Sequence, residues 1–119
     1  MDDTPEFFTV SEVDGVPELI LGTADFVSRP IIVLSQDQII EFIDKNKPKR
    51  LVINFKNVNH ISSEFITAMI RVRDHVLGHG GEMKFSHLND SVYAPFKITK
   101  LAGRLFTMYE TTSEAVDSF

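Results

Sequence analysis

The chain has 119 residues, of which 43% are apolar and ten are phenylalanine, so it is long enough to form a single domain with a substantial core. Its formal charge of -5 and its lack of a basic stripe exclude a typical nucleic-acid-binding surface. The sequence contains no cysteine, which excludes disulfides, thiolate metal sites and a cysteine nucleophile.

The first residues, Met1 to Pro5, are acidic rather than basic. No apolar run approaches the roughly 18 residues that a membrane-spanning helix requires. We therefore expect neither a signal peptide nor a membrane span, and we expect a cytoplasmic protein. The expected organisation is one domain over residues 1–119, with residues 1–5 as a disordered tail.

An antiparallel hairpin is expected near the beginning of the chain. Residues 6–13 are rich in strand-forming side chains, and Asp14-Gly15 favours a tight turn with positive φ. The apolar run 19–21 then provides the second strand. Pro17 lies near the beginning of that strand, where a missing N–H group is tolerated.

A first helix is predicted from about Gln36 to Asn46, because Ser35 and Gln38 have the spacing of a capping box. Pro48 is expected to stop this helix. The apolar run 30–34 before it fits either a brief edge strand or a packed lead-in. The nearly continuous apolar run 51–55 after it is typical of a central strand that is covered on both faces.

The second half of the chain alternates helices and strands. The expected elements are a helix from Glu64 to about residue 77, a strand at 83–86, a helix capped by residues 89–91, a strand at 105–109 and a helix capped by Thr111 and Glu114. Pro95 has to lie in about the first turn of its helix to be tolerated. This order predicts an α/β fold with a mixed, mainly parallel sheet of four to five strands and about four helices.

The middle of the chain resembles the STAS domain family, which is found in bacterial anti-sigma factor antagonists and in the cytoplasmic tails of sulfate transporters. That family has an apolar strand, a loop ending in Asp-Ser-Ser/Thr-Gly, an apolar helix, a Gly-Gly turn and another strand. The matching segments here are residues 51–55, 65–77, 80–83 and 96–101, with Lys100 where the family usually has Gly. The likeness extends from Phe7 to Val116 and implies a STAS fold.

The family's signature is altered in this chain. Counting back without gaps from the Gly-Gly turn places the family's Asp at Ser62, its first Ser at Ser63, its phosphorylated Ser/Thr at Glu64 and its Gly at Phe65. A shift by one residue would instead place Ile61 at the Asp, and Ser63 at the phosphorylated residue. We prefer the first alignment, because a shift by one residue would rotate the apolar face of the helix by about 100°.

The resemblance implies a noncatalytic regulatory protein. In the family, a serine kinase of the GHKL type, which also acts as an anti-sigma factor, phosphorylates the hydroxyl residue at the beginning of the helix. The unmodified form binds the kinase, and the phosphate prevents that binding. Glu64 at the acceptor position could not take a phosphate and would act as a fixed negative charge. That charge would either mimic the phosphate and lock the domain in a phosphorylated-like state, or leave the domain as a scaffold that is never switched at this residue. Ser63 and Ser62 remain candidate phosphorylation sites. The expected partner-binding residues are Asn59, His60, Ser62, Ser63, Glu64, Thr67, Arg71 and Asp74.

Several alternatives remain open. Ser62 and Ser63 also fit a role as helix caps, and Glu64 fits the role of an acid that favours the helix dipole. Phe65 would either reshape the partner surface or fill the core. The domain would otherwise serve as a scaffold or as a sensor of a nucleotide or lipid-like ligand beside the same helix.

Catalytic and metal sites have little support in the sequence. No acid-base pair or nucleophile arrangement stands out, so we do not expect an enzyme. His75 and His79 have a spacing that could present two imidazoles to one metal, but no third ligand lies nearby in the sequence. We therefore expect neither a metal nor a cofactor. The sequence leaves the oligomeric state open, including a homodimer.

Overall fold

The computed structural model describes residues 7–119, so Glu6 and the expected tail at residues 1–5 lie outside the described residues. The elements are β1 Phe8–Val13, β2 Val16–Leu21, β3 Asp25–Phe26, α1 Arg29–Asn46, β4 Arg50–Asn54, β5 His60–Ile61, α2 Ser63–Gly78, β6 Glu82–Ser86, α3 Asp90–Ile98, β7 Thr107–Tyr109 and α4 Thr112–Asp117.

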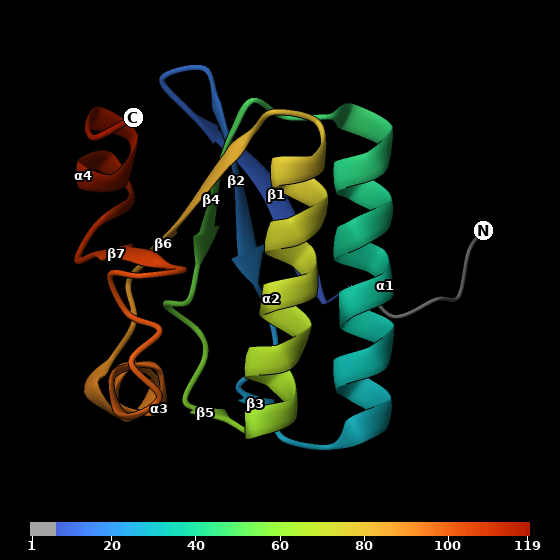
Figure 1. The fold of residues 1–119 in the computed structure, drawn as a ribbon, viewed down its shortest axis with the longest axis vertical. Helices are drawn as coiled ribbons and strands as arrows, with labels where there is room; N and C mark the ends of the chain where they lie inside the picture. The colour runs from blue at the N-terminus through green and yellow to red at the C-terminus, as the bar shows by residue number, and fades with distance from the viewer. Residues whose placement is uncertain (1–6) are drawn as a thin grey trace.

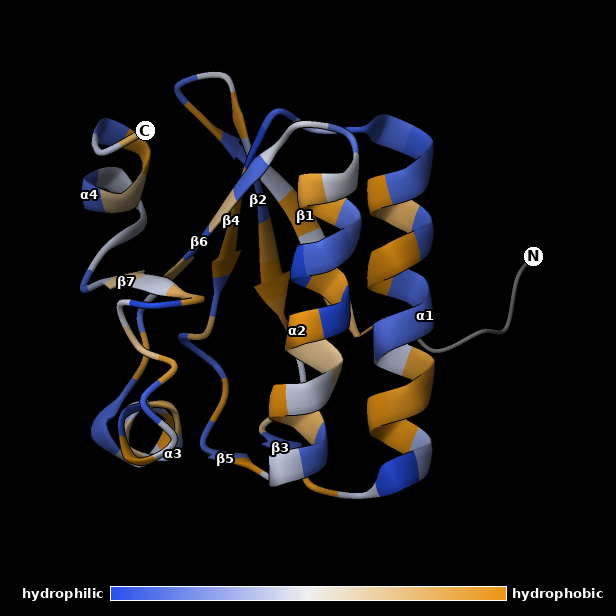
Figure 2. Cartoon of the chain, in the orientation of Figure 1, coloured by the Kyte–Doolittle hydropathy of each residue, from blue (hydrophilic) through white to orange (hydrophobic). Residues whose placement is uncertain are grey.

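The main sheet has five strands in the order β1-β2-β4-β6-β7, and only β1 is antiparallel to its neighbour. The helices α1 and α2 lie side by side over one face of this sheet, while α4 packs on the other (Figure 1). Apolar and polar residues alternate along α1 and α2 (Figure 2). This pattern is typical of a helix that packs one apolar face on the core and exposes a polar face to solvent. The mixed, mainly parallel α/β fold is confirmed.

The expected hairpin is present. Asp14 and Gly15 have φ angles of 49° and 80°, the left-handed conformation that a two-residue turn between antiparallel strands requires. Val13 pairs with Val16 across the turn, which places the nitrogen of Pro17 on the side away from β1. Pairing between β2 and β4 begins only at Glu18, so the missing N–H of Pro17 removes no ladder bond.

The central strand β4 is buried on both faces, as predicted. It pairs in parallel with β2 on one side and with β6 on the other. Leu51 and Ile53 belong to the main core beneath α1 and α2, whereas Val52 packs with the apolar side chains of α4. The alternation of side chains along one strand therefore supplies both layers.

The predicted beginning of the first helix was wrong. Helix α1 begins at Arg29, where the Oγ of Ser28 accepts a hydrogen bond from the Ile31 N–H, and Pro30 lies in the first turn. Proline is favoured there because its missing donor is unpaired in any case. Ser35 is buried within the helix, and its hydroxyl donates to the Ile32 carbonyl at 3.0 Å. The run 30–34 is thus neither an edge strand nor a lead-in.

Three smaller features also differ from the expected ones. The strands β3 and β5 form a separate two-stranded sheet that was not predicted. Pro95 lies in the second turn of α3, beyond the expected first turn. Strand β7 has three residues rather than five, because the N–H groups of Leu105 and Phe106 both donate to the Leu101 carbonyl and form a turn instead.

A buried polar network fixes α4 to the sheet. The Glu18 carboxylate accepts hydrogen bonds from the Asn54 amide at 2.9 Å and from the Thr112 hydroxyl at 2.5 Å. The Ser86 hydroxyl lies 2.7 Å from the Thr112 hydroxyl, to which it donates when Thr112 donates to Glu18. All four residues are buried, so each needs the others to satisfy its hydrogen-bonding groups.

We predict that Thr112→Val lowers the free energy of unfolding by about 1–3 kcal/mol. The substitution keeps the size of the side chain but leaves Glu18 and Ser86 short of one hydrogen-bond partner each. Urea unfolding would measure the change, and Ser113→Ala, at the exposed neighbouring position of α4, is the control. Equal stabilities of the two variants would contradict a structural role for the network.

Candidate functional site

The predicted site lies where α2 begins, at the carboxyl ends of the parallel strands β2, β4 and β6 (Figure 1). In α/β folds, the loops at this edge of the sheet commonly form the binding surface. Residues 55–62 connect β4 to α2 and include β5. The beginnings of α1 and α2 lie at the same end of the molecule (Figure 1).

The small sheet of β3 and β5 holds this connection in place. The N–H groups of Asn59 and His60 donate to the Ala24 carbonyl at 2.7 and 3.1 Å. The Nδ1 atom of His60 donates to the Asp25 carboxylate at 2.6 Å. The side chains of Asn59 and His60 are nevertheless exposed, so a fixed backbone presents two polar groups to solvent.

The two serines have different roles at the beginning of α2. Ser62 is the N-cap, and its Oγ accepts a hydrogen bond from the Phe65 N–H at 3.4 Å. Ser63 is exposed, and its carbonyl accepts from the Thr67 hydroxyl at 3.3 Å. Glu64 is an exposed acid in the first turn. The cap role therefore belongs to Ser62, whereas Ser63 and Glu64 are available to a partner.

Phe65 fills the core and does not reshape the surface. Its side chain is fully buried. The ring packs against Phe26 with a centroid distance of 4.7 Å and meets Phe55 edge-on at 6.2 Å. These contacts place residue 65 inward and residue 64 outward, and so set the rotation of the first turn of α2.

A groove between α1 and α2 brings together three of the predicted residues. Glu64, Thr67 and Arg71 line one side of this space of about 270 Å³. The other residues that line it are Arg29, Ile32, Val33 and Gln36 of α1. Arg71 Nη1 donates to Gln36 Oε1 at 3.3 Å across the groove.

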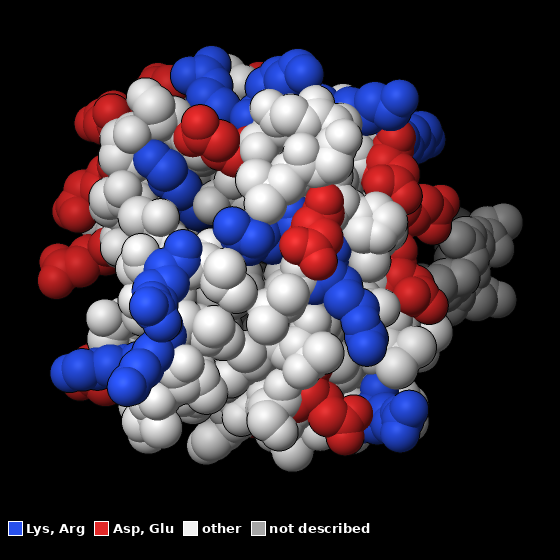
Figure 3. Space-filling model, in the orientation of Figure 1, with Lys and Arg blue, Asp and Glu red and all other residues white. Residues whose placement is uncertain are grey.

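The sequence did not indicate the contribution of α1, because the helix was expected to begin only at Gln36. The segment Ser28-Arg29-Pro30 contains the missing signal, a cap residue followed by proline in the first turn. Acidic and basic side chains are interspersed over the face that α1 and α2 form (Figure 3).

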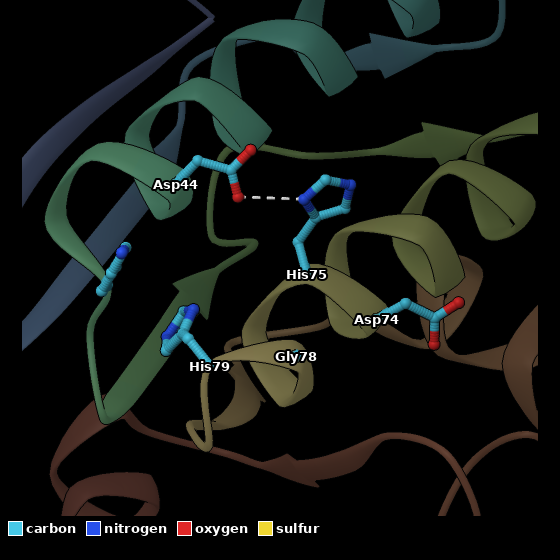
Figure 4. A pocket seen from close by; sticks show the side chains of 6 residues that line it. Asp44, Asp74, His75, Gly78 and His79 are labelled. Carbon is cyan, nitrogen blue, oxygen red and sulfur yellow. Dashed lines mark hydrogen bonds and ion pairs between the residues drawn. The ribbon is translucent and has the colours of Figure 1, made fainter.

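Asp74 does not lie with the other predicted residues. It lines a second groove of about 440 Å³ near the other end of α1 and α2, together with Asp44, His75 and His79 (Figure 4). The His75 Nδ1 atom lies 3.0 Å from the Asp44 carboxylate, and the His79 Nε2 atom donates to the Pro48 carbonyl at 2.7 Å. Separate partners thus hold the two imidazoles.

Within residues 7–119, no group of three or more His, Cys, Asp or Glu side chains is arranged to hold a metal ion. The helices of this part of the chain are also too short or too polar to cross a membrane.

Comparisons with known proteins agree with this architecture. The profile of the STAS domain family matches residues 18–115. A STAS domain protein from Planctomyces limnophilus superposes with a TM-score of 0.78 at 13% identity, covering 93% of this chain and 96% of that chain. An anti-sigma factor antagonist from Mycobacterium paratuberculosis superposes with a TM-score of 0.78 at 17% identity, covering 98% of this chain and 96% of that chain. A search of curated proteins by sequence returns no match.

The anti-sigma factor antagonist SpoIIAA in its unphosphorylated form gives a TM-score of 0.73 at 15% identity, covering 93% of this chain and 94% of that chain. The structure of the Bacillus protein SpoIIAA in its phosphorylated form gives a TM-score of 0.65 at 16% identity, covering 93% of this chain and 97% of that chain. At these identities the similarity demonstrates a common fold.

We predict that Ser62→Ala and Ser63→Ala differ in stability. Loss of the cap at position 62 should lower the free energy of unfolding by about 1 kcal/mol, because the Phe65 N–H loses its side-chain acceptor. Ser63→Ala should stay within about 0.5 kcal/mol of the wild type, because the Ser63 side chain is exposed. Urea titrations of the two variants make the comparison. A larger loss for Ser63→Ala would mean that the cap is assigned to the wrong serine.

Proposed function

The chain belongs to the STAS domain family, and we propose that it is a noncatalytic regulator of the anti-sigma factor antagonist type. In this proposal it binds a GHKL-type serine kinase that acts as an anti-sigma factor. The contact surface is the beginning of α2 with the loop before it. The observation that supports the proposal is the exposed carboxylate of Glu64 in the first turn of α2. In the ungapped alignment that we prefer, position 64 corresponds to the phosphorylated hydroxyl of the family.

The fixed charge of Glu64 has a direct physical meaning. A phosphate at this place would add about -1.5 to -2 charges at a helix N-terminus. Glu64 supplies one permanent negative charge there and has no hydroxyl to modify. Because Phe65 is anchored between Phe26 and Phe55, Glu64 has to point outward. The site in this proposal is therefore not switched by phosphorylation at position 64.

The neighbouring groups are suited to recognition by a protein. Ser63, Glu64 and Thr67 form an exposed polar edge along the first turns of α2, and Arg71 continues it beside α1. His60, held by Asp25, extends the surface onto β5. This combination of a rigid backbone with exposed polar side chains favours a protein partner, because little ordering is required on binding.

A small-ligand sensor has weaker support. The groove beside α2 measures about 270 Å³, just below the range of about 300–1,000 Å³ that is usual for ligand pockets. Its polar groups also compete with one another, since Arg71 is already bonded to Gln36. The protein-binding role is therefore the one we propose.

The proposal predicts that the wild-type protein binds the serine kinase encoded nearest to it but gains no phosphate with ATP and Mg²⁺. The Glu64→Ser variant restores a hydroxyl at the acceptor position, so it should gain one phosphate at position 64. That phosphate should weaken kinase binding by about tenfold or more. Intact-mass measurement with site mapping detects the phosphate, and calorimetry measures the binding.

Glu114→Ser provides a matched control, because Glu114 is also an exposed acid in the first turn of a helix, here α4. This variant should bind like the wild type and gain no phosphate. Phosphate on Ser63 of the wild type that is lost in Ser63→Ala, or phosphate mapped to Ser62, would contradict the proposed alignment. Absence of both binding and phosphate in every variant would reject the kinase as a partner.

A further inference from the structure

Strand β1 is an exposed edge of the main sheet. It has six residues, pairs only with β2 and forms one edge of the main sheet. Its four middle residues, 9–12, are exposed on both faces of the sheet. Val10 is 55% exposed, which makes it the most exposed large apolar side chain among the strands.

The hydrogen-bonding groups of alternate β1 residues point away from the sheet. The Gly22 N–H donates to the Phe7 carbonyl at 2.8 Å, so these opposite residues form a hydrogen-bonded pair. Such pairs alternate along antiparallel strands. The N–H and C=O groups of Phe8, Val10 and Glu12 therefore face outward. Within residues 7–119, no hydrogen bond from another element reaches them.

The usual protection of an edge strand is missing from β1. Edge strands are commonly shortened, interrupted by proline or a bulge, or guarded by lysine. The opposite edge strand, β7, has only three residues. By contrast, β1 has no proline, lysine or bulge, and Glu12 is its only charged residue.

We propose that β1 pairs with β1 of a second copy of this chain to form a symmetric antiparallel dimer. A two-fold axis through this edge has to match outward-facing residues with one another. Centring the pairing on Val10 satisfies this condition for the whole strand. Val10 then pairs with itself, and Phe8 pairs with Glu12 of the other copy.

The side chains of the strand are complementary in this register. The single acid of each copy faces an aromatic ring rather than another acid, so no like charges are opposed. Thr9 lies opposite Ser11 on the other face, a pair that can form hydrogen bonds. The two exposed Val10 side chains become neighbours and cover each other. These features identify a second copy as the partner, since the strand is its own complement.

The dimer leaves the beginning of α2 uncovered, because β1 lies at the sheet edge and β2 separates it from β4, from which the chain continues to α2. The two functions are thus compatible, and this inference does not rest on the proposed kinase binding. A single strand pair is a small interface, so the association should depend on concentration.

Light scattering coupled to size-exclusion chromatography tests the dimer over a range of concentrations. The wild type should approach twice the 13.5 kDa of one chain as the concentration rises. Val10→Glu should remain at one chain, because two carboxylates would meet at the axis. Leu34→Glu is the matched control, since Leu34 is 46% exposed on α1, and it should dimerise like the wild type. A monomeric wild type, or a Val10→Glu dimer, would overturn the proposal.

A cysteine pair tests the register itself. The chain has no cysteine of its own, so Val10→Cys introduces a single thiol. Opposite residues in a hydrogen-bonded antiparallel pair have Cα atoms about 5.5 Å apart, which is within the range of disulfides. Val10→Cys should form a covalent dimer under mild oxidation much faster than Leu34→Cys. Equal rates would contradict pairing at Val10.

Discussion

The arrangement of this domain depends on the burial of β4 on both faces. Every residue from Leu51 to Phe55 is buried, so each alternate side chain has to find a partner in a different layer. Ile53 and Phe55 belong to the aromatic core beneath α1 and α2. Asn54 points the other way and joins the polar network that holds α4. One short strand therefore determines the positions of the helices on both sides.

The same strand positions the candidate site. Phe55, which directly follows β4, contacts Phe65 in the first turn of α2, and Phe65 packs against Phe26 at the end of β3. This aromatic cluster ties the connection between β4 and α2 to the core. It leaves Ser63 and Glu64 outward on a rigid backbone. The exposed position of Ser63 and Glu64 is thus a direct consequence of the burial of Phe65 beside them.

The sequence predicted those parts of the fold whose signals are local and periodic. The central strand, the apolar face of α2, and the cap in which the Thr111 hydroxyl accepts from the Glu114 N–H were all predicted and are present. At the beginning of α1, the spacing of Ser35 and Gln38 predicted a cap, and the earlier cap signal of Ser28 was missed. Ser28 with Pro30 forms the cap, because Ser35 is on the buried face of the helix.

The other differences arise from contacts between distant segments. The strands β3 and β5 have two residues each, too few for any periodicity, and form only because Asp25 and His60 meet through the fold. For the site, the sequence indicated the α2 residues but not the α1 side of the groove, which depends on where α1 begins. Lys100 is a separate case. Its φ of 61° lies in the left-handed region, which favours glycine, and glycine is the residue that the family usually has at this position. This chain therefore adopts a left-handed conformation at a lysine, and the loop presents a cation there.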